Sequence, residues 1–185
     1  MDINETLMKK YNIIVADPPW KFGQKQTKTS LRVEQHYKTM SLKELYAFDL
    51  IKIIAAKNCA LYIWAPDCFI KDAIAIGESY GFQYKTIAFI WTKLRGIKLN
   101  LCKNPTPYGL KSHEICILLT KGKIRQHIVK FNILQDFQSI RGKHSEKPKY
   151  VLDTIHEMFP NVPKIEIFAR IKHEHFDAYG EHYET

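Results

Sequence analysis

The residues with the clearest chemical potential are Asp17-Pro18-Pro19-Trp20, which directly follow an apolar run over residues 13–16. Asp17 offers a carboxylate and Pro18 a backbone carbonyl, which the ring of Pro19 holds in an extended segment. Two such acceptors could bind both N–H bonds of an aromatic amine, such as that of adenine, and return its delocalised lone pair to nitrogen. The indole of Trp20 offers a flat face on which a base could stack. The alternative is an ordinary strand-ending turn with a capping aspartate.

The neighbouring residues predict where this motif lies. The apolar run Ile13-Ile14-Val15-Ala16 is too short for a helix and fits a buried strand of a parallel sheet. Two consecutive prolines end the strand, because proline cannot donate a hydrogen bond to the ladder. Asp17 is therefore expected at the carboxyl end of a strand, where open α/β sheets bind their ligands.

Strands and helices alternate along the rest of the chain. Further strands are expected at residues 60–64, 84–91, 114–119 and 164–168, with a ragged one at 128–134. A capping box at Ser41 and Glu44 opens a helix expected to run to about Ala56, and two more helices are expected at residues 66–81 and 146–160. The alternation predicts an α/β three-layer fold with a mostly parallel central sheet. The length predicts a single domain over residues 1–185.

The chain is basic, with a formal net charge of +9, and this favours a polyanionic partner. Ten of its cations fall in two stretches that are expected to be long loops after strand ends, residues 21–38 and 93–111. They are Lys21, Lys25, Lys28, Arg32 and Lys38, and Lys93, Arg95, Lys98, Lys103 and Lys111. Both loops are expected to contact phosphates around the site; solvated loop charge is the alternative.

Several function classes find no support. The four cysteines lack Cys-x-x-Cys spacing, so structural thiols in a cytoplasmic protein are expected and no metal site is. His173 and His175 are expected in a solvated tail. No apolar run has the length of a membrane span, and the first ten residues do not form a signal peptide. The eight glycines contain no Gly-x-Gly, so no local pattern indicates a nucleotide cofactor.

The whole chain resembles the MT-A70 family of S-adenosylmethionine-dependent adenine N6-methyltransferases, whose hallmark is Asp-Pro-Pro-Trp after an apolar strand. Further segments match in order and spacing: Tyr37-Lys38-Thr39-Met40-Ser41, Leu61-Tyr62-Ile63-Trp64, Phe89-Ile90-Trp91-Thr92-Lys93, His113-Glu114, His144-Ser145-Glu146-Lys147-Pro148, Ile165-Glu166-Ile167-Phe168-Ala169-Arg170 and Phe176-Asp177-Ala178-Tyr179-Gly180-Glu181. The resemblance implies a Rossmann-like methyltransferase with permuted motifs, in which the catalytic motif comes first. This order accounts for the missing glycine fingerprint.

The resemblance also implies roles for individual residues. The motif Asp17-Pro18-Pro19-Trp20 is catalytic, and S-adenosylmethionine is the cofactor. Its pocket is formed by Asp17, Pro18, Lys147, Phe168, Arg170, Gly180 and Glu181. The target base lies between Trp20 and Tyr37, and the surrounding nucleic acid is expected to contact Lys21, Lys25, Lys93, Arg95 and Tyr108.

The substrate follows less directly from the sequence. A compact catalytic chain without RNA-binding additions favours DNA over RNA, which presents the same amine. The rival from another class is a non-catalytic nucleic-acid-binding subunit, but intact Asp17, Trp20 and Lys147 speak against it. A homodimer or a related methyltransferase subunit remains open as a partner.

Overall fold

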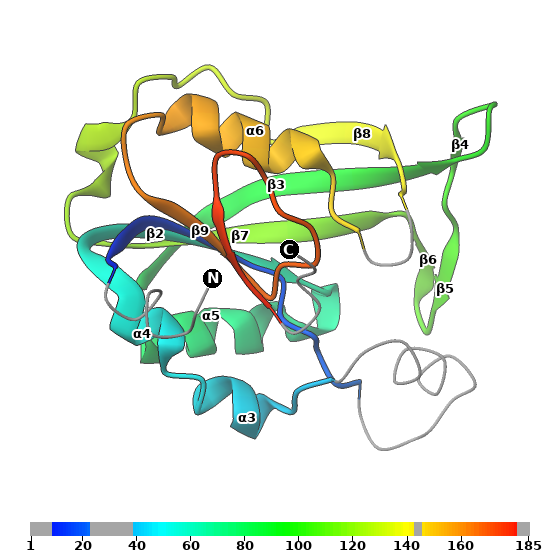
Figure 1. Cartoon of the computed structure of the whole chain (residues 1–185). Helices are drawn as coiled ribbons and strands as arrows, with labels where there is room; N and C mark the ends of the chain where they lie inside the picture. The colour runs from blue at the N-terminus through cyan, green and yellow to red at the C-terminus, as the bar shows by residue number, and fades with distance from the viewer. Residues whose placement is uncertain (1–8, 23–38, 143–145, 181–185) are drawn as a thin grey trace.

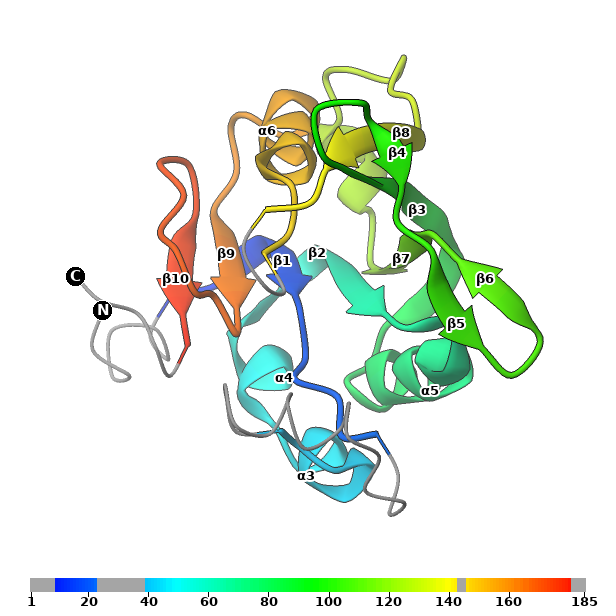
Figure 2. The same ribbon diagram turned by 90° about the vertical axis from the view of Figure 1, so that its right-hand side faces the viewer.

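The computed structural model describes residues 9–22, 39–142 and 146–180. Within these residues, an eight-stranded sheet lies between α6 on one face and α3, α4 and α5 on the other, and a separate hairpin lies at one end (Figures 1 and 2). The predicted α/β three-layer fold with a mostly parallel sheet is confirmed. No helix of the described part is long and apolar enough to cross a membrane.

The elements of the described residues follow in chain order. The strands of the large sheet are β1 (Tyr11–Ala16), β2 (Ala55–Ala65), β3 (Gln83–Arg95), β4 (Asn100–Leu101), β7 (His113–Lys121), β8 (Asp136–Ile140), β9 (Lys164–Ile167) and β10 (Asp177–Tyr179). The separate hairpin consists of β5 (Asn104–Thr106) and β6 (Gly109–Lys111). The α-helices are α3 (Leu42–Tyr46), α4 (Leu50–Ile54), α5 (Ile70–Ser79) and α6 (Lys149–Met158), and two 3₁₀ turns are η1 (Asp67–Phe69) and η2 (Ile124–His127).

Strand β1 lies in the middle of the sheet and pairs in parallel with both β2 and β9. Strand β10 continues the parallel order beyond β9, whereas β7 runs antiparallel between β2 and β3. In the described sheet, all strands except β4 and β7 therefore run in the same direction. Their carboxyl ends meet at the edge that faces the viewer in Figure 2, and Asp17 follows β1 at this edge.

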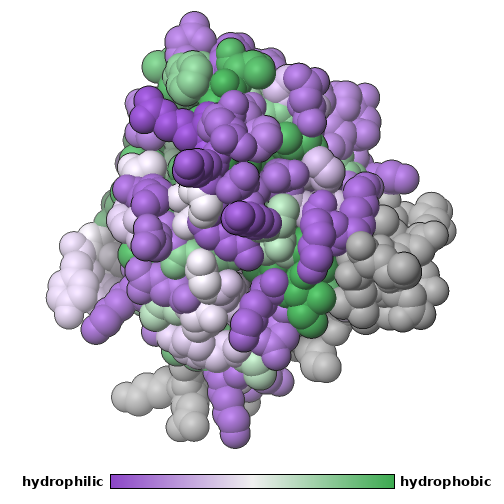
Figure 3. Space-filling view, turned by 90° about the vertical axis from the view of Figure 1, so that its left-hand side faces the viewer, coloured by the Kyte–Doolittle hydropathy of each residue, from purple (hydrophilic) through white to green (hydrophobic). Residues whose placement is uncertain are grey.

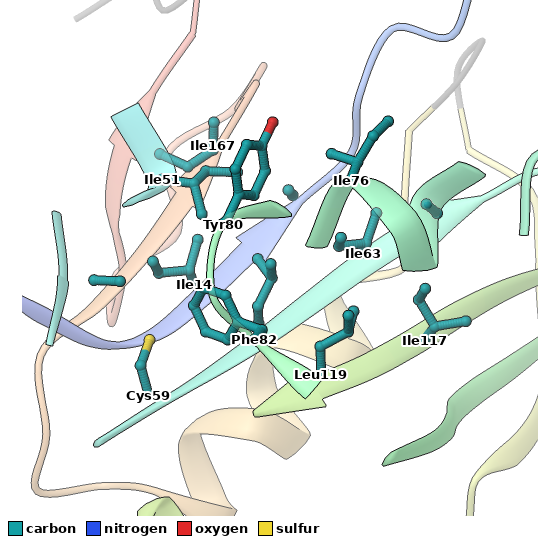
Figure 4. Packing of buried hydrophobic residues seen from close by; sticks show 14 of the residues in the cluster. Ile14, Ile51, Cys59, Ile63, Ile76, Tyr80, Phe82, Ile117, Leu119 and Ile167 are labelled. Atoms are coloured by element: carbon teal, nitrogen blue, oxygen red, sulfur yellow. The ribbon is translucent and has the colours of Figure 1, made fainter. Parts of the chain in front are cut away.

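Both faces of β1 are buried, because its apolar side chains alternate between two cores. Ile14 belongs to the cluster that also contains Ile51 of α4 and Ile76 of α5 (Figure 4). On the other face, Ile13 and Val15 pack in the cluster that contains Ile155 of α6. A strand held on both faces and both edges gives Asp17 a fixed position.

The capping box predicted at Ser41 is confirmed, but the long helix predicted to follow it is wrong. The Glu44 carboxylate accepts from the Ser41 N–H at 2.7 Å, and the Ser41 hydroxyl accepts from the Glu44 N–H at 3.3 Å. Helix α3 nevertheless ends at Tyr46, α4 is separate, and β2 begins at Ala55. Tertiary contacts override the local pattern, because Phe48 turns to pack on Phe168 with ring centroids 5.0 Å apart.

The long loop predicted at residues 93–111 is also wrong, because this stretch forms two hairpins. Strand β3 continues to Arg95 and turns back through Gly96, which has a φ of +67°, into β4. A second turn joins β5 to β6, where the Thr106 hydroxyl donates to the Gly109 carbonyl at 2.9 Å. Glycine and proline at the turns had indicated a loop, although the same residues also close hairpins.

Three further expectations need correction. His173, which was expected in a solvated tail, is only 6 % exposed, and its Nε2 lies 2.8 Å from Asp153 Oδ1. Residues 128–134 form no strand, and the strand in this region is β8, which pairs in parallel with β3 from Ile90 to Leu94. Strand β10 was not expected in a tail rich in histidine and aromatic residues. It forms because Asp177 is held by the Tyr11 hydroxyl at 2.8 Å and by the Lys9 ammonium at 2.6 Å.

Candidate active site

Side chains from four parts of the chain meet at the carboxyl edge of the parallel strands. Asp17 follows β1, Trp64 lies near the end of β2, and Arg170 follows β9. Lys147 comes from the segment before α6. These four residues line both a cavity of about 490 Å³ and a neighbouring cavity of about 190 Å³, so the two cavities meet at them.

A chain of alternating charges crosses the junction of the two cavities. The Lys147 ammonium lies 2.7 Å from Asp17 Oδ2 and 3.5 Å from Glu114 Oε2. The Lys93 ammonium pairs with Glu114 from the other side. All four side chains are largely enclosed, with 16 to 28 % of each exposed. Each charge is thus held between partners of opposite sign in a region of low dielectric.

These pairs determine the protonation states of Lys147 and Glu114. Burial by itself lowers the pKa of a lysine, but the carboxylates of Asp17 and Glu114 outweigh it and raise the pKa of Lys147 above its ordinary value. Burial raises the pKa of Glu114, but Lys147 and Lys93 outweigh it and lower that pKa. Both groups are therefore charged at neutral pH.

Backbone hydrogen bonds fix the motif after β1. The Asp17 N–H donates to the Ile167 carbonyl at 3.4 Å, which ties the motif to the end of β9. The Pro18 carbonyl accepts from the Trp20 N–H at 2.9 Å, and the Pro19 carbonyl accepts from Met40 at 2.7 Å. The Pro18 carbonyl keeps a second lone pair for another donor, so its predicted role as an acceptor is compatible with this turn.

Trp20 does not present the open face that the sequence suggested. Only 5 % of the residue is exposed, its indole N–H donates to the Trp64 carbonyl at 3.0 Å, and its ring stacks on Phe69 at 5.1 Å between centroids. Trp20 still lines the smaller cavity together with Phe22. Its expected role as an open stacking platform is corrected to that of a fixed wall.

The larger cavity combines groups that suit a ligand with both charged and flat parts. Glu166 of β9 and Phe168 directly after β9 line it, and the N-terminus of α6 lies at it through Pro148 and Lys149. Phe168 has a φ of +64°, which is uncommon for a residue with a side chain and typical of functional sites. Cations, carboxylates and an aromatic ring in one cavity can bind a zwitterionic molecule that also carries hydroxyls and an aromatic base.

Glu166 is a half-buried carboxyl group in this cavity. Burial, with the nearby Asp17 charge, raises its pKa from an ordinary value near 4.5 to about 7. Because the pKa of Glu166 is raised in the folded state, the protein loses stability as the pH rises above about 4.5 and through about 7, where Glu166 ionises.

We expect Glu166→Gln to remove this loss, so that the unfolding free energy of the variant exceeds that of the wild type at pH 8 by up to about 3 kcal/mol. Urea unfolding from pH 5 to 8 measures the difference, and parallel pH profiles would contradict it.

Close packing against the backbone explains why residue 180 is a glycine, and the sequence did not reveal this. A Cβ at this position would lie 2.1 Å from the Ala169 carbonyl oxygen and 2.9 Å from the Ala169 nitrogen. Both are backbone atoms, and the Ala169 N–H also donates to the Tyr179 carbonyl at 3.1 Å. The close approach of the two segments holds the residues after β9 next to the larger cavity.

The other predicted site residues fall into different groups. Lys93 points inward to Glu114 and is only 17 % exposed, and its contact with nucleic acid stays a prediction. Lys21 is exposed beside the motif, Arg95 is exposed at the end of β3, and Tyr108 is fully exposed between β5 and β6. Lys25, Tyr37 and Glu181 lie outside the described residues.

Sequence reasoning missed Trp64, Glu114 and Glu166 as site residues. Each lies at or near a strand end of the carboxyl edge, and for Glu166 the signal was a lone carboxylate in an apolar strand. In the described part of the chain, no three His, Cys, Asp or Glu side chains gather into a group that could hold a metal ion.

Comparison with known proteins gives two findings. The model of the MT-A70 family matches residues 11–182. The chain is 38 % identical over 188 residues to the Type II methyltransferase M.MunI of a Mycoplasma species, and the match covers 93 % of this chain and 77 % of that protein. The matched region contains the whole candidate site.

Proposed function

Since the chain belongs to the MT-A70 family and is a methyltransferase, we propose that it transfers a methyl group from S-adenosylmethionine to the N6 amine of adenine in DNA. The main support for this proposal is that two cavities meet at the Asp17–Lys147 ion pair. A reaction between two bound molecules needs such a junction, because their reacting atoms must be held together in one geometry.

The larger cavity suits S-adenosylmethionine, which supplies an electrophilic methyl group on a sulfonium when bound. Lys147 would bind the carboxylate of its amino-acid part, and Glu166 is placed to accept from hydroxyl or ammonium groups. Phe168 and Arg170 offer a ring and a planar cation for the nucleoside part. The Asp17 carboxylate, and Glu166 when it is ionised, also favour a ligand with a positive centre.

The smaller cavity would hold the target adenine. The base must leave its stack, since its amine cannot be reached inside a duplex. The Asp17 carboxylate and the free lone pair of the Pro18 carbonyl would accept its two N–H bonds. Lys147 already occupies Asp17 Oδ2, so Oδ1 is the oxygen that would face the amine. Asp17 thereby orients the nitrogen and can take up the proton that the amine loses.

We prefer DNA to RNA because the chain is similar to a Type II methyltransferase; its strongly basic charge suits either polyanion. The experiment uses labelled S-adenosylmethionine with single-stranded DNA, duplex DNA and RNA that contain adenine, and identifies the product nucleoside by mass. We expect N6-methyladenine on DNA. Methylation of RNA alone would overturn the substrate, and cofactor binding without any methylation would favour the non-catalytic subunit.

A further inference from the structure

Two hairpins extend from the sheet at the edge that carries the candidate site. One joins β3 to β4 through residues 96–99, and the other consists of β5 and β6 (Figures 1 and 2). We call residues 95–111 the hairpin pair. Almost all of these residues are exposed, with Cys102 as the buried exception. A protruding two-stranded ribbon has dimensions that suit a groove of duplex DNA.

The hairpin pair carries positive charge only. Arg95, Lys98 and Lys103 are exposed cations, and the stretch contains no acidic residue. Arg141 is exposed next to it, where its backbone N–H donates to the Leu94 carbonyl at 3.0 Å. Two copies meeting through this surface would bring like charges together, whereas a polyanion would neutralise them.

Large apolar side chains project among these cations. Ile97 and Tyr108 are as exposed as in an extended chain, at 101 % each, and Leu110 is 66 % exposed. Tyr108 lies in the turn between β5 and β6, so its ring is at the tip of the hairpin. Exposed aromatic rings can stack on bases, and apolar side chains can wedge between base steps.

The base of the second hairpin is tied to the smaller cavity. The Lys111 ammonium lies 2.9 Å from Asp67 Oδ1, and Asp67 opens the turn whose Phe69 stacks on Trp20. Three residues after Lys111, Glu114 lines the smaller cavity itself. The hairpin therefore rises at the side of the cavity proposed for the target adenine.

We propose that the hairpin pair binds duplex DNA beside the target adenine, with Arg95, Lys98 and Lys103 on phosphates and Tyr108 against bases in the groove. The proposal rests on the proposed function, since it takes DNA as the substrate. Beyond that function, the proposal identifies the hairpin pair as the segment that holds the duplex and Tyr108 as the residue that contacts bases next to the extruded adenine.

The test measures binding of a labelled 30-base-pair duplex pool, with a fixed central adenine and randomised flanks, by fluorescence anisotropy over a range of salt. The full chain is compared with Arg95→Gln/Lys98→Gln/Lys103→Gln and with Tyr108→Ala. The charge control is Lys57→Gln/Lys123→Gln/Arg125→Gln, three exposed cations at the opposite, largely hydrophilic edge of the sheet (Figure 3). The aromatic control is Tyr84→Ala, which is 38 % exposed at that same edge.

We expect the hairpin triple variant to lose at least tenfold in affinity at moderate salt and its slope of log K against log salt to fall by about 3. Tyr108→Ala should weaken binding about tenfold with an unchanged slope. Both should keep wild-type cofactor affinity, and the controls should bind DNA like the wild type. Methylation of the duplex pool should fall in parallel with binding.

Two kinds of failure are distinguishable. If the wild type methylates DNA and the hairpin variants bind and methylate equally well, or if the controls lose as much, the inference is overturned while the proposed function stands. A change of oligomeric state in Tyr108→Ala, without loss of DNA affinity, would show a protein interface instead. If the wild type binds the cofactor but neither binds nor methylates any DNA, the proposed function falls as well.

Discussion

Asp17→Ala is expected to lower the rate of methyl transfer by at least about 1,000-fold, because it removes the carboxylate that would orient the amine and accept its proton. Asp17 follows β1 and contributes no side chain to either core, so the sheet should stay folded. Lys147 keeps Glu114 as a partner at 3.5 Å. The measurement is the single-turnover rate with labelled cofactor, beside circular dichroism of the folded variant.

Asp17→Asn is the matched control for the shape of the side chain. Its amide keeps an oxygen near Lys147 but cannot take up a proton, so we expect a loss of the same order as for alanine. Turnover close to the wild type in Asp17→Ala would contradict the catalytic role. If Asp17→Asn alone keeps the wild-type turnover, Asp17 orients the amine but takes no part in proton transfer.

Lys147→Met is expected to weaken S-adenosylmethionine binding by about 10- to 100-fold, the effect of losing one charge-assisted hydrogen bond. The raised pKa of Lys147 means that the lost group is a charged ammonium at neutral pH. The variant also leaves Asp17 without its cation, so methyl transfer should fall beyond the loss in binding. Isothermal titration calorimetry gives the affinity, and saturating cofactor separates the two effects.

Lys130→Met is the control away from both cavities. The Lys130 side chain is 43 % exposed, pairs with Glu157 at 2.5 Å and lines neither cavity, so its removal should change cofactor affinity by less than about threefold. Equal losses in both variants would indicate a general effect of charge. An unchanged affinity in Lys147→Met would remove Lys147 from the cofactor site.

The sequence predicted the elements that are determined by residues close to one another along the chain. The apolar runs that became β1, β2 and β9 are buried on both faces, and the capping box of α3 depends on two residues three positions apart. The position of Asp17 at the carboxyl edge follows from such a strand followed by two prolines. These features need no knowledge of distant contacts.

The parts that the sequence did not predict depend on partners far along the chain. Strand β8 forms because β3 offers a free edge at Ile90–Leu94, and β10 because Asp177 reaches Tyr11. The inward position of Lys93 depends on Glu114, 21 residues away, and the burial of Trp20 on Phe69. Neither residue type nor spacing carries that information.

The central place of β1 has a consequence for how the protein is made. Residues 11–16 leave the ribosome before one of their two sheet neighbours, residues 164–167, which is synthesised some 150 residues later. Contacts of such long sequence separation slow folding. We therefore expect nascent chains stalled before residue 164 to expose β1 along one edge and to need protection from aggregation. Cofactor binding should appear only once β9 has emerged.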